Sequence, residues 1–321
     1  MKSFSEKTHR TNWACAWAIC CVFFPALTTS FAQEYATTFI VPGARAAANA
    51  ESGVGDILDI ASMYGNPASL AFLTSTDILL SHRKDWNEKI FHENLTVPVL
   101  LSTKVALGVG ASAHRAGTFS SSSNLKFTEY GIDVGIGFRI YPVLSFGVMF
   151  SGYNGVTDRG NLSAGLASLG VVYSPTPDIS YGLKFNGLGA ANRYYLSSDG
   201  TQSMVQRITP DQSVEIGSTM RFPTTRERPI IVVSIAAQKF VRGGDPRLSS
   251  RAQIDENRIR GGIEIRPVSS VGMRFGYLSG PFQRGPRFGL VVSVSQIEIA
   301  YTAATGERDY RYDVFSLQVR F

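Results

Sequence analysis

Apolar and polar residues alternate one by one along most of the chain after residue 75. Near the end, Phe315, Leu317, Val319 and Phe321 fall on one side, and the residues between them are polar. A period of two is the pattern of a β-strand, because successive side chains of a strand point to opposite faces. This stretch is therefore predicted to be a strand with one apolar face.

The same alternation recurs in many stretches, each roughly 9–12 residues long. Typical globular strands have about 5–6 residues, whereas a tilted strand needs about 9–11 to cross a bilayer. The second face of each stretch is small or charged, as at Gly131, Gly135 and Gly137. Glycine weakens an ordinary strand, but small inward residues of a barrel leave room for a plug or a lumen.

The connections between the stretches differ in length. Short turns are predicted at Tyr141–Pro142, Ser174–Asp178 and Pro267–Ser270, and long polar loops at Arg115–Asn124, Gly189–Asp211 and Val241–Glu256. Outer-membrane barrels combine short periplasmic turns with longer outer loops. We therefore expect an all-β fold, a closed transmembrane antiparallel β-barrel over residues 76–321, with about 14 strands or alternatively about 12.

Closure makes a specific demand on the last strand. It must pair with the first strand after residue 75, because a membrane leaves no water to satisfy an open sheet edge. The terminal aromatic Phe321, preceded by alternating apolar residues, resembles the C-terminal insertion signal of bacterial outer-membrane proteins.

Strand parity also assigns a set of charged side chains to the inner face of the barrel. These predicted lumen-facing charges are Asp133, Arg139, Lys184, Arg260, Glu264, Arg266, Arg274 and Glu298. They either line a pore or neutralise one another within a sealed interior.

Residues 1–32 have the features of a signal peptide. Lys2, Lys7 and Arg10 precede an apolar run and a small-residue cleavage site at Ser30–Ala32. All three cysteines lie in this leader, so the mature chain has no disulfide and no thiolate site. The formal net charge of +6 falls to +4 when three basic residues and one acidic residue leave with the leader, which argues against nucleic acid as a partner.

Residues 33–75 do not alternate and carry two short motifs. Gly43-Ala44-Arg45-Ala46 is followed about twenty residues later by Asn66-Pro67-Ala68. This pattern resembles the N-terminus of the PorV/PorQ family, within the wider FadL-like group of outer-membrane barrels. The resemblance implies that these motifs precede fourteen strands and pack inside the barrel as a hatch; a plain periplasmic extension is the alternative.

Two finer expectations concern this hatch segment. Ile57, Ile60, Ala61 and Tyr64 have helix-like spacing, so a short amphipathic helix is predicted over Asp56–Met63. Arg45 is a candidate partner for one of the inner-face acids, and the candidates are Asp133, Glu264 and Glu298.

No arrangement typical of an enzyme is evident. The mature histidines are His82, His92 and His114, and no serine stands where barrel phospholipases keep theirs. They are expected at the rim or at an interface. No P-loop, EF-hand or zinc spacing is present, so no catalytic residue, cofactor or metal is predicted.

The expected protein is thus an integral protein of the bacterial outer membrane. The resemblance implies an accessory or shuttle role in type IX-like secretion, with secretion components and cargo as partners. Passive FadL-like uptake of a hydrophobic small molecule and a purely structural barrel are the alternatives. Outer-membrane lipid, lipopolysaccharide and the barrel-assembly machinery are expected as further partners.

Overall fold

The computed structural model describes most of the chain after the leader. The described residues are 41–86, 90–119, 125–157, 160–196, 202–208, 212–222, 230–241, 257–279, 284–306 and 311–321. The predicted signal peptide at 1–32 lies outside them, as do residues 33–40. Among the described residues, no helix is long and apolar enough to span a membrane.

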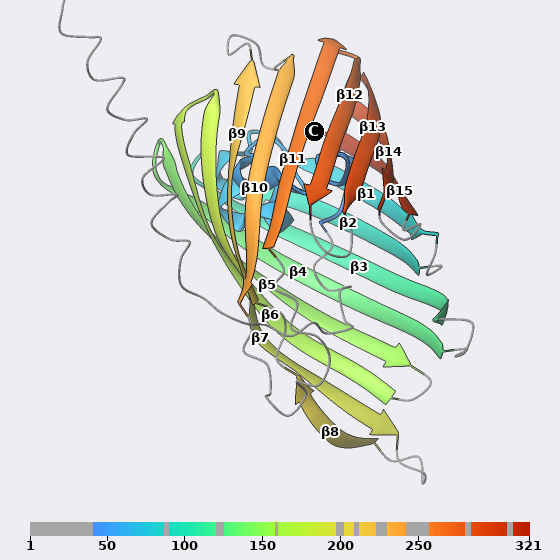
Figure 1. The fold of residues 1–321 in the computed structure, drawn as a ribbon. Helices are drawn as coiled ribbons and strands as arrows, with labels where there is room; N and C mark the ends of the chain where they lie inside the picture. The colour runs from blue at the N-terminus through green and yellow to red at the C-terminus, as the bar shows by residue number, and fades with distance from the viewer. Residues whose placement is uncertain are drawn as a thin grey trace, which may run out of the picture.

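One large antiparallel sheet contains all of the strands (Figure 1). Its elements are β1 (Asp77–Asp85), β2 (Ile90–Leu100), β3 (Val105–Phe119), β4 (Leu125–Tyr141), β5 (Leu144–Thr157), β6 (Gly160–Thr176), β7 (Ile179–Leu196), β8 (Gln202–Ile208), β9 (Gln212–Phe222), β10 (Ile231–Val241), β11 (Asn257–Val268), β12 (Val271–Ser279), β13 (Gly285–Val294), β14 (Ile297–Thr305) and β15 (Arg311–Arg320). The predicted short turns after Tyr141, Thr176 and Val268 are confirmed, because a new strand begins within three residues of each.

The sheet closes into a ring of fourteen strands. Each strand pairs with the next, the β6–β7 pairing joins the two ends of the sheet order, and β8 continues the line of β9 along β7. β1 pairs with β15 in a continuous register from Asp77↔Arg320 to Asp85↔Tyr312. The predictions of a closed barrel with fourteen strands and of a first-to-last strand seam are confirmed.

The two faces of the wall differ as strand parity predicts. In β4, Ile132, Val134 and Ile136 are exposed on the outside, whereas Asp133 and Gly135 between them are buried. The same alternation of exposed apolar and buried polar or small residues runs along most of β12 and β13. An apolar outer surface around a polar inner one is the surface of a transmembrane barrel.

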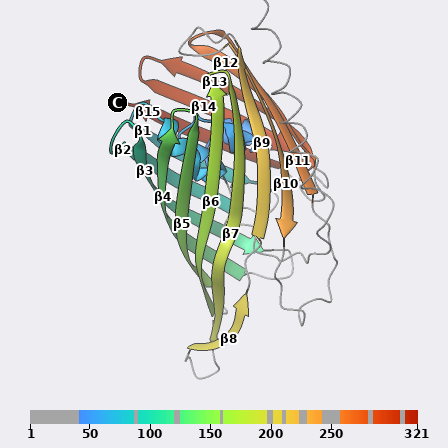
Figure 2. The same cartoon turned by 90° about the vertical axis from the view of Figure 1, so that its left-hand side faces the viewer.

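The strands are of two lengths. β3 to β7 have 14–18 residues, whereas β1, β2 and β9 to β15 have 9–12. The prediction of long loops at Arg115–Asn124 and Gly189–Asp211 is wrong in part, because β3 extends into the first segment and β7 and β8 extend into the second. Polar composition indicated a loop there, but the cross-strand pairing continues. Figure 2 shows β8 at the far end of the long strands.

One irregularity interrupts β7. Its pairing with β9 ends at Asn186↔Ser213, and its pairing with β8 begins at Ala191↔Ile208. Between these pairs Gly187 and Gly189 have φ values of 78° and 154°, which other residues rarely adopt. The register against β6 also shifts at this level. The long wall therefore bends here through a glycine bulge.

The segment before β1 lies inside the barrel, where Figure 1 draws it in blue. It contains α2 (Ala44–Ala48), η2 (Gly53–Gly55), α3 (Ser62–Gly65) and η3 (Pro67–Phe72). The described part of this segment, residues 41–75, is called the hatch below.

The predicted helix over Asp56–Met63 is wrong. Asp56 accepts a hydrogen bond from the Leu58 N–H, and Asp59 accepts one from the Ala61 N–H. Both aspartates therefore form local turns that compete with a helix. Ile57, Ile60, Ala61 and Met63 of this stretch are buried in different hydrophobic clusters, whereas Leu58 is exposed.

Candidate functional site: the hatch and the polar interior

The inner wall is shaped to hold the hatch. An added Cβ at any of several inward glycines would lie less than 3.0 Å from a backbone atom of the hatch. These positions include Gly137, Gly147, Gly182, Gly262 and Gly276. Because these inward glycines have no side chain, the hatch backbone can lie directly against the wall.

Asn66 of the Asn-Pro-Ala motif ties the hatch to itself and to the wall. Its side-chain amide donates to the carbonyl oxygens of Val54, Val171 and Leu183 at 3.0, 3.0 and 3.3 Å. Its side-chain oxygen accepts from the Ala68 N–H at 3.1 Å and caps η3. Asn66 is fully buried, so one side chain supplies partners to several backbone groups that water does not reach.

The Gly-Ala-Arg-Ala motif contacts the strands of the closing seam. The Gly43 N–H donates to Ser81 Oγ of β1, and the Ala44 N–H donates to Ser316 Oγ of β15. Thr302 Oγ1 of β14 donates to the Ala44 carbonyl oxygen at 2.6 Å. Ala46 belongs to α2 and is half-buried.

Arg45 is the centre of a paired charge cluster. Its guanidinium lies 2.9 Å from Glu264 and 3.3 Å from Asp56 of the hatch, with Asp59 at 3.9 Å. Of the three acids considered for Arg45 from the sequence, the structure pairs it with Glu264. The full cluster, called the hatch network, consists of Arg45, Asp56, Asp59, Arg221, Glu264, Arg266, Arg274 and Glu298.

The hatch network is balanced in charge, with four arginines and four acids. Burial raises the pKa of the Asp59 carboxyl above its ordinary value, and Arg45 only partly opposes this effect. Burial acts on Asp56 as well, but the Arg45 and Arg221 guanidiniums outweigh it and hold the pKa of that carboxyl below its ordinary value. Two nearby carboxyls of the hatch are therefore shifted in opposite directions.

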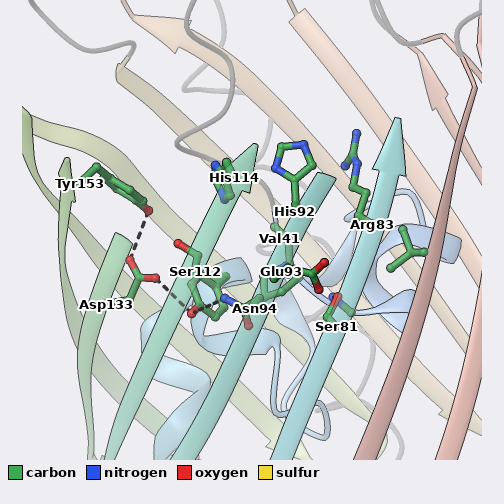
Figure 3. A pocket seen from close by; sticks show the side chains of 14 residues that line it. Val41, Ser81, Arg83, His92, Glu93, Asn94, Ser112, His114, Asp133 and Tyr153 are labelled. Atoms are coloured by element: carbon green, nitrogen blue, oxygen red, sulfur yellow. Dashed lines mark hydrogen bonds between the residues drawn. The ribbon is translucent and has the colours of Figure 1, made fainter. Parts of the chain in front are cut away.

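Tyr64 joins the hatch to the opposite wall. Its hydroxyl donates to Asp133 at 3.1 Å and accepts from Asn94 at 3.2 Å. Asp133 also accepts from the Tyr153 hydroxyl at 3.2 Å, as Figure 3 shows. Burial raises the pKa of Tyr64, with Asp133 adding to the effect, so its hydroxyl stays protonated as a donor.

All eight predicted lumen-facing charges lie inside the barrel. Asp133 accepts a hydrogen bond from the Tyr64 hydroxyl of the hatch. Arg139 donates to the Ala71 carbonyl oxygen, and Lys184 donates to the Tyr64 carbonyl oxygen. Arg260 pairs with Glu215, and Glu264, Arg266, Arg274 and Glu298 belong to the hatch network. Five of the eight thus form ion pairs, and Asp133, Arg139 and Lys184 form hydrogen bonds to the hatch. Phe321 lies at the seam, where its N–H donates to the Thr76 carbonyl oxygen.

A second polar cluster went undetected in the sequence. Arg83, His92, His114 and Glu129 are successive cross-strand partners on β1, β2, β3 and β4. This set is called the His row. The expectation that the histidines lie at the rim is wrong for two of them, because His92 and His114 are only 5% and 6% exposed. Strand register brings the row together, and register cannot be seen in residue spacing.

A small cavity adjoins the His row and the hatch (Figure 3). Tyr64, His92, His114, Asp133 and Tyr153 line it. Its free volume of about 30 Å³ holds about two water molecules. The side chains that line it include charged and hydrogen-bonding groups, and the cavity is too small for an aromatic hydrocarbon.

The fold resembles those of several solved bacterial channels. The monoaromatic hydrocarbon channel CymD superposes with a TM-score of 0.63 at 12% identity, over 88% of this chain and 98% of that one. A FadL homologue of Pseudomonas aeruginosa gives 0.59 at 13%, and the toluene transporter TbuX of Ralstonia pickettii gives 0.55 at 14%; each comparison covers 87% of this chain and 98% of the other. This chain has the FadL-like barrel fold.

The likeness is one of structure. No protein-family model and no curated protein sequence matches the chain. A FadL-like barrel with an apolar outer face is consistent with an outer-membrane location.

Proposed function

We propose that this FadL-like barrel is an outer-membrane channel for small hydrophobic molecules, with the hatch as its closure. The observation that carries the proposal is a hatch enclosed by a complete ring, in the fold shared with channels for toluene and monoaromatic hydrocarbons. Apart from the chain link to β1, the described residues of the hatch contact the wall through packing, hydrogen bonds and ion pairs. It can therefore be displaced without opening the ring.

Transport in this proposal requires the hatch to move. The cavity beside Tyr64 has room for about two water molecules, so it is too small to hold a hydrocarbon while the hatch is in place. A purely structural barrel would have the same filled interior. The difference between the two is functional: only a channel carries solute when the hatch is free and stops when it is fixed.

Uptake is best measured in cells whose outer membrane contains lipopolysaccharide, because toluene dissolves directly into plain lipid bilayers. Cells producing the protein should accumulate labelled toluene faster than cells with an empty vector. Equal rates across a range of hydrophobic solutes would contradict the channel and leave the structural barrel.

A disulfide lock tests the role of the hatch. All three cysteines lie in the predicted signal peptide, so Ala44→Cys and Ser316→Cys introduce the only cysteine pair after residue 32. The two positions are close together, because the Ala44 N–H donates to Ser316 Oγ at 3.3 Å. The oxidised double variant should lose uptake and regain it on reduction. Each single variant is the matched control and should transport under both conditions.

The PorV/PorQ resemblance supports a second candidate function, an accessory role in type IX-like secretion. Its support is that both motifs of the resemblance, Gly43–Ala46 and Asn66–Ala68, belong to the hatch and contact the wall. Affinity capture of the barrel from its native outer membrane should then recover secretion components or cargo. Capture of such partners together with a lack of solute uptake would favour this candidate over the channel.

A further inference from the structure

The His row contains buried polar atoms that lack hydrogen-bond partners. They are both ring nitrogens of His92, Nδ1 of His114 and both carboxylate oxygens of Glu129. His92 is 5% exposed and Glu129 is 1% exposed, so water from outside does not reach them freely. Unsatisfied buried groups in a native protein indicate a missing water, proton or ion.

The side chains of the row are close together. His114 Nδ1 lies 3.1 Å from Glu129 Oε1, without hydrogen-bond geometry, and the His92 and His114 rings are 4.5 Å apart at their centroids. Asp85 lies 3.6 Å from His92 Nε2 and also pairs with Arg83. The row is thus a chain of nitrogen and oxygen donors across four adjacent strands.

The charge around the row is unbalanced. With neutral imidazoles, Arg83 contributes one positive charge, while Asp85, Glu129 and Asp133 contribute three negative ones. Arg287 lies 5.2 Å from the same Tyr312 ring that the Arg83 guanidinium contacts at 3.7 Å, and it is the next cation among the described residues. With Arg287 included, these groups carry two positive and three negative charges, so the surroundings favour a bound cation.

Two imidazoles and one carboxylate form a donor set suited to zinc, cobalt, nickel or ferrous ions. We propose that His92, His114 and Glu129 bind one divalent transition-metal ion inside the barrel. In the described residues no three acidic, histidine or cysteine donors yet surround a common point. Binding therefore requires the imidazoles to turn, and the cavity that both rings line gives them room.

A metal ion at this position would join β2, β3 and β4. It would also lie beside the cavity lined by Tyr64, so it would stiffen the wall against which the hatch rests. Protonation of both imidazoles is the competing way to balance the charge, and it predicts no metal binding at all.

The test uses the untagged mature protein in detergent, freed of metal by a chelator. Titration with Zn²⁺ should show one saturable site per chain, and Co²⁺ should give the visible absorption of a nitrogen- and oxygen-ligated ion. His92→Gln, His114→Gln and Glu129→Gln should each abolish or strongly weaken binding. His82→Gln is the matched control, because His82 pairs with Glu93 on the exposed face and should leave binding unchanged.

A second measurement does not depend on the folding of any variant. Zn²⁺ should shift the imidazole NMR signals of His92 and His114 in the unmodified sequence, while the signal of His82, in its exposed pair with Glu93, stays in place. No saturable binding, unchanged binding in the His92→Gln/His114→Gln double variant, or unshifted His92 and His114 signals at saturating Zn²⁺ would each overturn the proposal.

Discussion

The hatch network and the His row lie in the same barrel interior, and both consist of charged or ionisable side chains nearly inaccessible to solvent. In the hatch network every carboxylate faces at least one guanidinium, and charges of the two signs are equal in number. In the His row both oxygens of the Glu129 carboxylate, both ring nitrogens of His92 and Nδ1 of His114 lack hydrogen-bond partners. The hatch network holds a segment of the chain in place, whereas the His row has nitrogen and oxygen atoms available to bind a ligand.

The comparison shows that buried charged groups can either fix a segment of the chain or remain available for binding. A buried ion pair contributes little net stability, but removing one partner is strongly destabilising because the other charge stays buried. When a buried group that already lacks a partner is removed, no neighbouring charge is left unpaired. Substitutions in the two clusters should therefore differ in cost although their burial is alike.

Glu264→Gln should have the largest effect. Glu264 faces Arg45, Arg266 and Arg274 and is 2% exposed, so its neutralisation leaves a surplus of buried positive charge. We expect a loss of about 3–5 kcal/mol in the free energy of unfolding. Urea unfolding in detergent, followed by fluorescence, measures it. Glu93→Gln, at an exposed pair, is the control and should cost at most about 1 kcal/mol.

Gly147→Ala should disturb the hatch without touching the His row. The added Cβ would collide with the backbone of Pro67 and Ala68, so the hatch must shift. A cost of about 1–3 kcal/mol is expected. Gly152→Ala on the same strand is the control, because nothing lies within 4 Å of its added Cβ. If both variants unfold at the same urea concentration, the hatch does not rest on this glycine.

Asp56→Asn and Asp59→Asn should differ in pH dependence. The pKa of Asp56 is lowered, so its ionised form stabilises the fold above the ordinary value of 3.8, and this contribution is lost as the pH falls through the lowered pKa. The pKa of Asp59 is raised, so its contribution is greatest below 3.8 and falls as the pH rises through the raised pKa.

At neutral pH, Asp56→Asn should therefore cost roughly 1 kcal/mol or more, and Asp59→Asn should be neutral or slightly stabilising. Thermal unfolding scans between pH 2 and pH 8 measure both variants. Parallel curves for the two variants would show that the carboxyls do not differ in their surroundings.

Glu129→Gln should have the smallest effect in metal-free protein. Glu129 has no hydrogen-bond partner to lose, and neutralising it removes a buried charge. We expect a change within about 1 kcal/mol of the original stability, in either direction. A loss as large as that of Glu264→Gln would show that the two clusters are equivalent and that the comparison fails.

Strand parity was enough to predict the barrel and its inner charges, because period two assigns every residue of a strand to a face. Asp133 and Glu264 could be assigned to the interior in this way. Which charges meet could not be predicted, since that depends on register and on the path of the hatch. The Asp56–Met63 segment shows the same limit: its spacing fits a helix, but its aspartates cap turns and bind arginines.

The His row was missed for a related reason. His92, His114 and Glu129 are separated by 22 and 15 residues, and no spacing rule for metal ligands applies to neighbours on adjacent strands. Two histidines at matching inward positions of paired strands would have been the signal, once the register was known.

The contact between Ala44 and Ser316 spans 272 residues and sits beside the seam of β1 with β15. Such distant contacts form late in folding, because the intervening chain must first be ordered. The hatch can become fully seated only when the last strand arrives to shut the ring. Closure of the ring and placement of the hatch are thus a single event. A hatch that is outside the barrel when β15 pairs with β1 could not enter through the closed wall.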